Sequence, residues 1–430
     1  MLAMGAHSKD TFLSRLSKLD GRVVLLLLLL GFFSLTRYCA LPKRKLVLWN
    51  ILGVSTITPN FFDLRAITSA WESQRLGYDP LVSNPRDPLR RLMNYPRIWL
   101  APSSLGLDQS HTAIIGVWMA ALFYVCVFLF VGELKTSHGV LYAVIICSPA
   151  VLLAVERGNN DLVIFALLAI GVCMVRYRRK LSPILYILVL AAAMLKLFPI
   201  FALTCVVREK PKRALITICL VAGAFVAYLL YTLHDIYVIG QAIGQNENLY
   251  PSYGSMIVFQ YVTIKASLSG QGPSRLFLRY ISLTCLLACL GLAYAWARSK
   301  KPDLPETEHS DAFRIGASIY LGTFVLGNSY DYRLIFLIFA LPQLLSWMRV
   351  RNRLGTFSKV LVASVVFSVW SMIFPETNPL MFILKELVRW FIFASFTGLL
   401  LATLPAWLRN RLFLIRATKV RRDPRQTLPN

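Results

Sequence analysis

Long apolar blocks are the feature that most constrains how this chain can fold. They recur from end to end, each with roughly 18 or more apolar residues, the length that a helix needs to cross a bilayer core. Of the 430 residues, 57% are hydrophobic and only 16% are charged, whereas soluble domains lie closer to half apolar and a quarter charged. The sequence therefore predicts an all-α, polytopic transmembrane bundle.

The blocks predict about ten full spans. These lie near residues 22–40, 112–132, 139–155, 161–175, 213–233, 276–297, 312–328, 333–348, 359–375 and 388–405. Another block, 181–207, is long for one crossing and short for two. We expect it to be a re-entrant or kinked hairpin broken near Pro199, because proline removes a helix hydrogen bond. One long helix is the alternative, but it would move the later basic clusters outside, against the positive-inside rule.

The net charge of +25 comes from short basic clusters between the apolar blocks. Such clusters are typical of membrane orientation and of contact with anionic lipid, so we predict no nucleic-acid partner. Both termini are predicted to be cytoplasmic, as segment 1–21 and the basic tail 406–430. They flank one membrane domain, 22–405, in the plasma (inner) membrane. The predicted outer segments are 41–111, 156–161, 234–275, 328–332 and 376–387.

A few charged residues in the predicted outer segments are candidates for chemistry. Asp63 lies between aromatic and apolar neighbours, a setting that can tune a carboxylate as a base. Glu72 and Asp79 are weaker candidates for that role. Tyr95 and Arg97 belong to a segment of alternating aromatics, prolines and charges, which would otherwise form only a structured cap on the membrane surface.

The other candidates interrupt or border apolar blocks, where charge is costly and usually functional or paired. In the tight turn after 155, the charges either lock a helix hairpin or face a phosphate. A lone lysine inside block 181–207 needs a partner or an aqueous cavity, and snorkelling is the weaker explanation. The pair at 331 and 333 is an internal ion pair or a sugar or phosphate contact. These residues are Glu156, Arg157, Asn159, Asp161, Lys196, Asp331 and Arg333.

Together these motifs resemble the GT-C superfamily of membrane glycosyltransferases. The most similar family is glycosyltransferase family 87, the polyprenol-phosphate-mannose-dependent mannosyltransferases and their bacterial relatives. The resemblance rests on the first-loop acid Asp63, the Gly77–Pro80 and Asn94–Pro96 segments, the E-R-G-N-x-D turn and the K-x-x-P motif at Lys196. It implies a GT-C-like helical bundle and inverting transfer from a lipid-phosphate sugar, with Asp63 as the base.

The implied reaction suits an outward-facing site. A nucleotide sugar is not expected outside the cytoplasm, and a phosphate leaving group needs no general acid. One carboxylate can take the acceptor proton while cations stabilise the phosphate. The expected partners are membrane lipid, a polyprenyl-phosphate sugar (mannose-like) and a glycan or glycolipid acceptor.

No cofactor or metal is predicted, because the eight cysteines lie in or beside apolar blocks without C-x-x-C and the five histidines are scattered. A divalent metal held by Asp63 and other acids stays an open alternative. A polymerase or ligase of lipid-linked glycans and a polytopic transporter or flippase are the rival functions.

Overall fold

The computed structural model describes residues 20–39, 49–242, 251–267, 274–299, 304, 307–374 and 378–413. Within these ranges almost all regular structure is helical, as predicted. The exception is a pair of two-residue strands, β1 (Ser252–Tyr253) and β2 (Ser329–Tyr330), which pair antiparallel. Of the predicted end segments 1–21 and 406–430, residues 1–19 and 414–430 lie outside the described residues.

The helices follow one another along the chain, and the longest connection within the described residues is 76–96. The α-helices are α2 (Gly21–Cys39), α4 (Phe62–Arg75), α5 (Thr112–Val131), α6 (Thr136–Ile146), α7 (Pro149–Arg157), α8 (Asp161–Tyr177), α9 (Ser182–Leu195), α10 (Pro211–Tyr231), α11 (Leu233–Ala242), α12 (Ile257–Ser267), α13 (Arg275–Ser299), α14 (Ser310–Val325), α15 (Leu341–Met348), α16 (Arg353–Trp370), α17 (Pro379–Ala402) and α18 (Ala406–Leu412). The 3₁₀ helices are η1 (Arg97–Leu105), η2 (Gln109–His111), η3 (Arg179–Leu181), η4 (Phe198–Arg208), η5 (Asp331–Ala340) and η6 (Ser371–Ile373).

The prediction of about ten full spans is not confirmed. Four of the described helices are long and apolar enough to cross a membrane, and the number rises to six if each bent pair counts as one span. Helices α6 and α7 form one such pair, with a bend of 52° at the break before Pro149. Helices α8 and α14, with 17 and 16 residues, are not among these candidate spans. Breaks of this kind leave hydropathy unchanged, so the sequence did not reveal them.

The predicted outer segment 376–387 is also corrected by the structure. Helix α17 begins at Pro379, so most of that segment is the first half of a long helix. Lys385 and Glu386 lowered its hydropathy, but both side chains are buried against other helices. Buried charges that neutralise one another can lie within a helix at membrane depth.

Block 181–207 forms a kinked hairpin, as predicted. Helix α9 ends at Leu195, and η4 begins at Phe198 with Pro199 in its first turn. Proline suits that position because the first-turn N–H has no helical partner. The two arms fold back on each other. A hydrogen bond across the base of the hairpin shows this: Tyr186 Oη donates to Glu209 Oε1 at 2.9 Å. Lys196 therefore lies at the tip.

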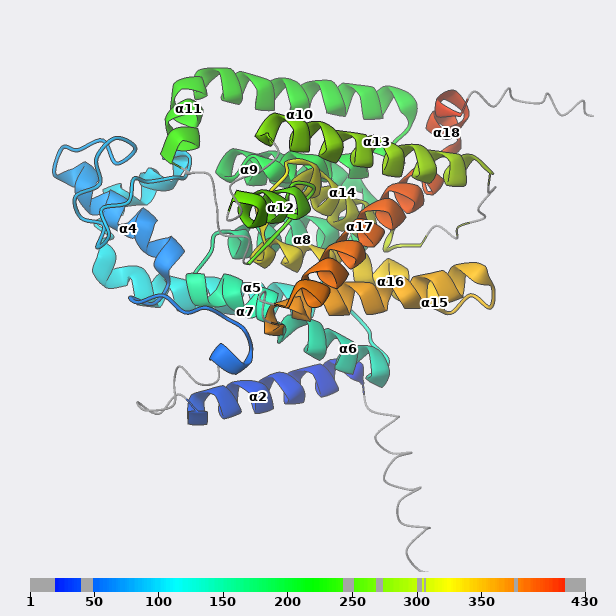
Figure 1. Cartoon of the computed structure of the whole chain (residues 1–430), viewed down its shortest axis with the longest axis horizontal. Helices are drawn as coiled ribbons and strands as arrows, with labels where there is room; N and C mark the ends of the chain where they lie inside the picture. Colours follow the sequence, from blue (N-terminus) through cyan, green and yellow to red (C-terminus); the bar gives the residue numbers. More distant parts are fainter. Residues whose placement is uncertain are drawn as a thin grey trace, which may run out of the picture.

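The two ends of the bundle differ in charge, and one of them is rich in arginine. At the basic end, Arg176 near the last turn of α8 contacts His309 at 3.4 Å, and Arg208 pairs with Asp311. Asp161 begins α8 at the opposite end, roughly 25 Å away at 1.5 Å per residue. Figure 1 shows α4 and α11 on one side of the bundle, and α18 with the α15–α16 connection on the other.

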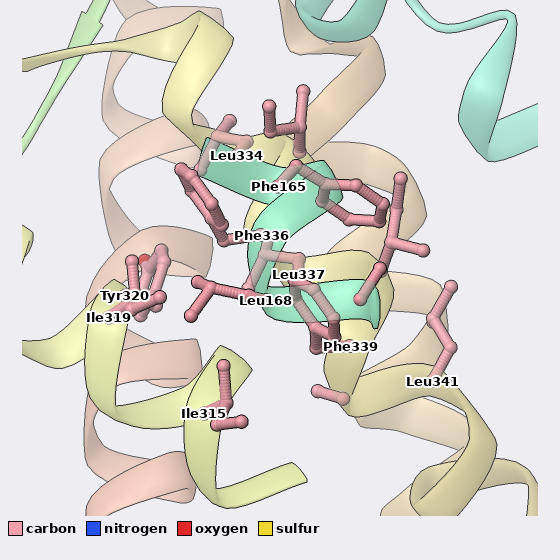
Figure 2. Close-up of a cluster of buried hydrophobic side chains, with 14 of the residues drawn as sticks. Phe165, Leu168, Ile315, Ile319, Tyr320, Leu334, Phe336, Leu337, Phe339 and Leu341 are labelled. Carbon is pink, nitrogen blue, oxygen red and sulfur yellow. The ribbon is translucent and has the colours of Figure 1, made fainter. Parts of the chain in front are cut away.

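An aromatic and aliphatic core joins the helices that carry the polar end. The rings of Phe165 in α8 and Phe339 in η5 lie 4.5 Å apart, and residues of α14 complete the cluster (Figure 2). At Gly316 of α14, an added Cβ would lie 2.7 Å from the Phe336 carbonyl oxygen. The small residue permits this approach, the usual way in which membrane helices gain packing contacts.

Candidate active site

Asp63 is held by the start of α4 against the turn between α7 and α8. It lies in the first turn of α4, two residues after Phe61, whose φ of 56° is left-handed. The Phe61 N–H donates to the Glu156 carbonyl at 3.2 Å, and its ring lies against Gly116 and Gly158. At Gly158 an added Cβ would lie 3.1 Å from Phe61, so the contact is tight. These contacts fix where the Asp63 carboxylate lies relative to the turn.

The turn reaches Asp63 through Asn159. Arg157 ends α7, Gly158 takes a φ of 57°, and Asp161 begins α8. Asn159 Nδ2 donates to Asp63 Oδ2 at 2.6 Å, while Asn159 Oδ1 accepts the Asp161 N–H at 3.0 Å. Within the described residues, no hydrogen bond reaches the second oxygen of Asp63, Oδ1. That oxygen is the one available to an incoming hydroxyl.

Lys196 at the hairpin tip joins the same turn. Its ammonium donates to Asn159 Oδ1 at 3.1 Å, Asn160 Oδ1 at 2.9 Å and Asp161 Oδ1 at 2.6 Å. Three aromatic rings lie about the ammonium, with centroids 5.4 to 6.0 Å away. These belong to Tyr95, Phe198 and Tyr332. The predicted need of this lysine for a partner is met inside the protein.

Arg333, from the first turn of η5, completes the cluster. Its Nη1 donates to Ser329 Oγ at 2.9 Å, and its guanidinium carbon lies 4.9 Å from the Phe198 ring centroid. Its Nε lies 3.9 Å from Asp161 Oδ2. Four separate segments thus bring their polar side chains together in one place, as the prediction of a common side requires. These side chains are Asp63, Asn159, Asp161, Lys196 and Arg333.

A cavity of about 230 Å³ opens beside this cluster. Lys196 and Arg333 form part of its wall, and Tyr95 and Arg97 border it from the outer segment. Part of the lining comes from α10, α11 and the residue between them. Its residues there are Tyr228, Thr232, Asp235, Ile236 and Ile239. A lining that combines apolar side chains with two cations suits an amphiphile with an anionic head.

The remaining candidates lie at the edges of the cluster or apart from it. Arg97 pairs with Asp79 at 2.7 Å and with Asp235 at 2.9 Å across the cavity mouth. Arg157 pairs with Glu156 at 3.1 Å and donates to the Ser55 carbonyl. Both pairs hold chain segments around Asp63 without contacting its carboxylate directly.

Asp331 belongs to a different network. Its two oxygens accept from Nη2 of Arg389 at 2.9 Å each, and Nη1 of Arg389 donates to Glu386 at 2.7 Å and to the Ser252 carbonyl. Lys385 caps the Phe374 carbonyl nearby. Of the two readings predicted for Asp331, the structure shows the buried ion pair. Sequence reasoning missed its partners, although charges at 385, 386 and 389 between apolar runs were a usable signal.

Sequence reasoning also missed several residues of the cluster itself. Asn160 occupied the variable position of the turn motif, and Ser329 lay beside the flagged charges. Phe198 and Tyr332 looked like ordinary core aromatics. Their role around Lys196 depends on the meeting of three chain breaks, which no local pattern indicates.

The surroundings shift the ionisation of groups in the outer segment. Burial raises the pKa of Asp63, although the nearby Arg157 and the Asn159 hydrogen bond oppose that effect. Burial also raises the pKa of Tyr95 well above its usual value, so this phenol stays protonated. The Arg97 hydrogen bonds lower the pKa of Asp79. A carboxylate with a raised pKa is the better proton acceptor, so Asp63 suits a base more than Asp79 does.

The described residues include no group of three or more His, Cys, Asp or Glu side chains that could hold a metal ion. The acids nearest to Asp63 are engaged elsewhere, because Asp161 binds Lys196 and Glu156 binds Arg157. The prediction that the protein needs no metal stays a prediction.

The fold and the site define a helical membrane protein that holds a carboxylate and two cations beside an apolar cavity. Residues 99–307 match the model of glycosyltransferase family 87. The match agrees with the resemblance seen in the motifs and supports a membrane glycosyltransferase. It covers the turn and Lys196 but not Asp63 or Arg333. No curated protein and no solved structure matches the chain significantly.

Proposed function

We propose that the protein transfers a hexose, mannose-like, from a polyprenyl-phosphate donor to an acceptor hydroxyl, with inversion at the anomeric carbon. The acceptor belongs to a glycan or glycolipid. The reaction takes place on the non-cytoplasmic face of the inner membrane. Asp63 is the base, and the cations beside the cavity stabilise the phosphate.

One observation carries the proposal. Asn159 links the Asp63 carboxylate to the Lys196 ammonium, with 2.6 Å on one side and 3.1 Å on the other. Through this link Asp63, the proposed proton acceptor, lies one side chain away from Lys196 in the cavity wall, which supports the proposal. A displacement on a sugar phosphate requires this arrangement, with the base on one side of the sugar and positive charge at the leaving group.

The steps balance without a further reactant. Asp63 Oδ1 takes the proton of the acceptor hydroxyl as its oxygen bonds to the anomeric carbon. The bond between that carbon and the phosphate oxygen breaks on the opposite face, which inverts the configuration. The electron pair leaves with the polyprenyl phosphate, whose added charge faces Arg333 in the cavity wall. The products are the glycoside, polyprenyl phosphate and protonated Asp63.

The basic end of the bundle supports the proposed orientation. Clusters of lysine and arginine favour the cytoplasmic side, and Arg176, Arg178 and Arg208 lie at the end away from Asp63. The site then faces outward, where a lipid-borne donor reaches it from the membrane. The apolar side chains of α10, most of them exposed on the surface of the protein, would face the lipid.

The test is sugar transfer by the purified protein in lipid nanodiscs. Polyprenyl phosphates carrying radiolabelled mannose or glucose serve as donors, and extracted membrane glycolipids serve as acceptors. We expect Asp63→Asn to lower kcat by about 100- to 10,000-fold, the usual contribution of a general base. Asp108→Asn is the matched control, because Asp108 has no contact with the cluster: it caps η2 through Ser110 and pairs with His111 and Arg75, and asparagine caps equally well.

The outcomes separate the candidate functions. Equal turnover by wild type and Asp63→Asn removes Asp63 as the base. Loss of turnover with Arg157→Ala but not with Asp63→Asn favours a polymerase or ligase of lipid-linked glycans. Movement of labelled lipid across the bilayer without any glycoside product would make the protein a flippase.

A further inference from the structure

The ammonium of Lys196 has no hydrogen-bond donor left for a ligand. A protonated lysine carries three N–H donors, and the side-chain oxygens of Asn159, Asn160 and Asp161 accept one each, at 2.6 to 3.1 Å. Three aromatic rings lie around the ammonium, with centroids 5.4 to 6.0 Å away. A phosphate would have to displace one of these contacts to bind Lys196 directly.

Arg333, unlike Lys196, has hydrogen-bond donors that no described residue uses. Its guanidinium carries five donors in a planar fork that matches phosphate oxygens. Of these, Nη1 is used by Ser329, and Nε has no hydrogen-bond partner among the described residues. The side chain borders the cavity and stays 19% exposed, so a ligand in the cavity can reach it.

Asp161 lies between the two cations and contacts them unequally. Its Oδ1 is 2.6 Å from Lys196 Nζ, whereas its Oδ2 is 3.9 Å from Arg333 Nε and accepts no hydrogen bond from any described residue. Asp161 is fully buried. Lys196 therefore neutralises Asp161, and Arg333 keeps its charge for another anion.

We infer that Arg333 binds the donor phosphate and that Lys196 is a positioning residue that keeps Asp161 from capturing Arg333. This inference rests on the proposed function, because it assigns the phosphate of that donor to one of two cations. Loss of Lys196 acts through Asp161: the freed carboxylate turns to Arg333 and closes the anion site. Removal of both Lys196 and Asp161 leaves Arg333 open.

The test measures binding of polyprenyl phosphate to the full-length protein in nanodiscs by microscale thermophoresis, with polyprenol as the probe that lacks phosphate. We expect Arg333→Met to raise the Kd for polyprenyl phosphate by about 10- to 100-fold, the effect of losing hydrogen bonds to a charged group. Lys196→Met is expected to raise it comparably. The double variant Lys196→Met/Asp161→Asn is expected to bind as wild type does.

The double variant Lys196→Met/Asp161→Asn is decisive because it removes both members of the ion pair, so neither is left charged and buried without the other. A double variant that is monodisperse, melts as wild type does and still binds weakly shows that Lys196 itself contacts the phosphate, which overturns the inference. Tight binding by Arg333→Met overturns it equally. In the variant Arg333→Met/Asp161→Asn we expect no recovery. Lys212→Met, an exposed lysine at the basic end, controls for the change in net charge.

Failure of this inference can be told apart from failure of the proposed function. Wild-type protein that binds polyprenyl phosphate no better than polyprenol removes the proposed donor class altogether. Wild-type protein that prefers the phosphate while the double variant shows no recovery changes only the roles of Lys196 and Arg333.

Discussion

Replacing Arg389 by methionine is expected to destabilise the protein more than any change in the cluster around Asp63. The Arg389 guanidinium donates to Asp331, to Glu386 and to the carbonyl of Ser252. All three side chains of this ion network are at most 4% exposed. The substitution keeps much of the side-chain volume, but it leaves two carboxylates buried without their partner.

The size of the effect follows from that burial. Removing one partner of a buried ion pair costs about 3–5 kcal/mol, because the other charge stays desolvated. Arg389 serves two carboxylates, so we expect the upper part of this range, about 5 kcal/mol. The Lys385 ammonium close by limits the loss. A second substitution, Asp331→Asn, removes one stranded charge and is expected to recover about half of the stability.

Equilibrium unfolding in mixed detergent micelles measures these differences, with helicity and tryptophan fluorescence as separate probes. The four proteins of the Arg389→Met and Asp331→Asn double-mutant cycle give the coupling energy between the two residues. Arg351→Met, at an exposed arginine between α15 and α16, is the control. An Arg389→Met protein as stable as this control would refute the reasoning.

Three further outcomes are expected. The wild-type kcat/KM should fall as the pH drops through the raised pKa of Asp63, because the protonated carboxyl cannot accept the acceptor proton; a pH profile whose acidic limb lies at the ordinary aspartate value would contradict this. Gly158→Ala should cost about 1 kcal/mol or more of unfolding free energy, because its φ is +57° and a Cβ would lie 3.1 Å from Leu64 and Phe61; an unchanged melting temperature would count against the tight turn. Arg97→Gln should change stability by less than about 1 kcal/mol, because its ion pairs are exposed; a large drop in melting temperature would show that it holds the outer segment in place.

The sequence indicated the cluster because charge inside apolar blocks is rare. Lys196 and the turn at Asn159 stood out for that reason, and the hairpin that brings them together followed from the basic residues at both of its ends. Within the first loop, only the apolar neighbours of Asp63 distinguished it from the other acidic residues as a candidate base. Contacts such as the one from Asn159 to Asp63 join residues far apart in the chain, and local patterns carry no information on such distances.

The errors have a common physical origin. Hydropathy averages over a window, so it detects neither a bend between α6 and α7 nor the paired charges in the first half of α17. Lys385 and Glu386 look costly one at a time. In the structure, each lies within reach of opposite charge or a carbonyl, so the cost falls and the helix extends through them. Pairing in three dimensions decides where such a span begins.

The broken helices explain how a mostly apolar bundle can hold a polar site. Each segment that contributes to the cluster does so where a helix starts, ends or turns back: Asp63 at the start of α4, Asp161 at the start of α8, Lys196 between α9 and η4, and Arg333 at the start of η5. The ends of a helix carry backbone N–H and C=O groups without helical partners, and these groups need polar partners. Non-helical backbone at membrane depth is stable only where protein or a cavity surrounds it. The breaks and the charges therefore support each other. An uninterrupted helix through 196–198 would have to carry the Lys196 ammonium away from its three oxygens, so the interruption that shortens the spans is also what forms the site.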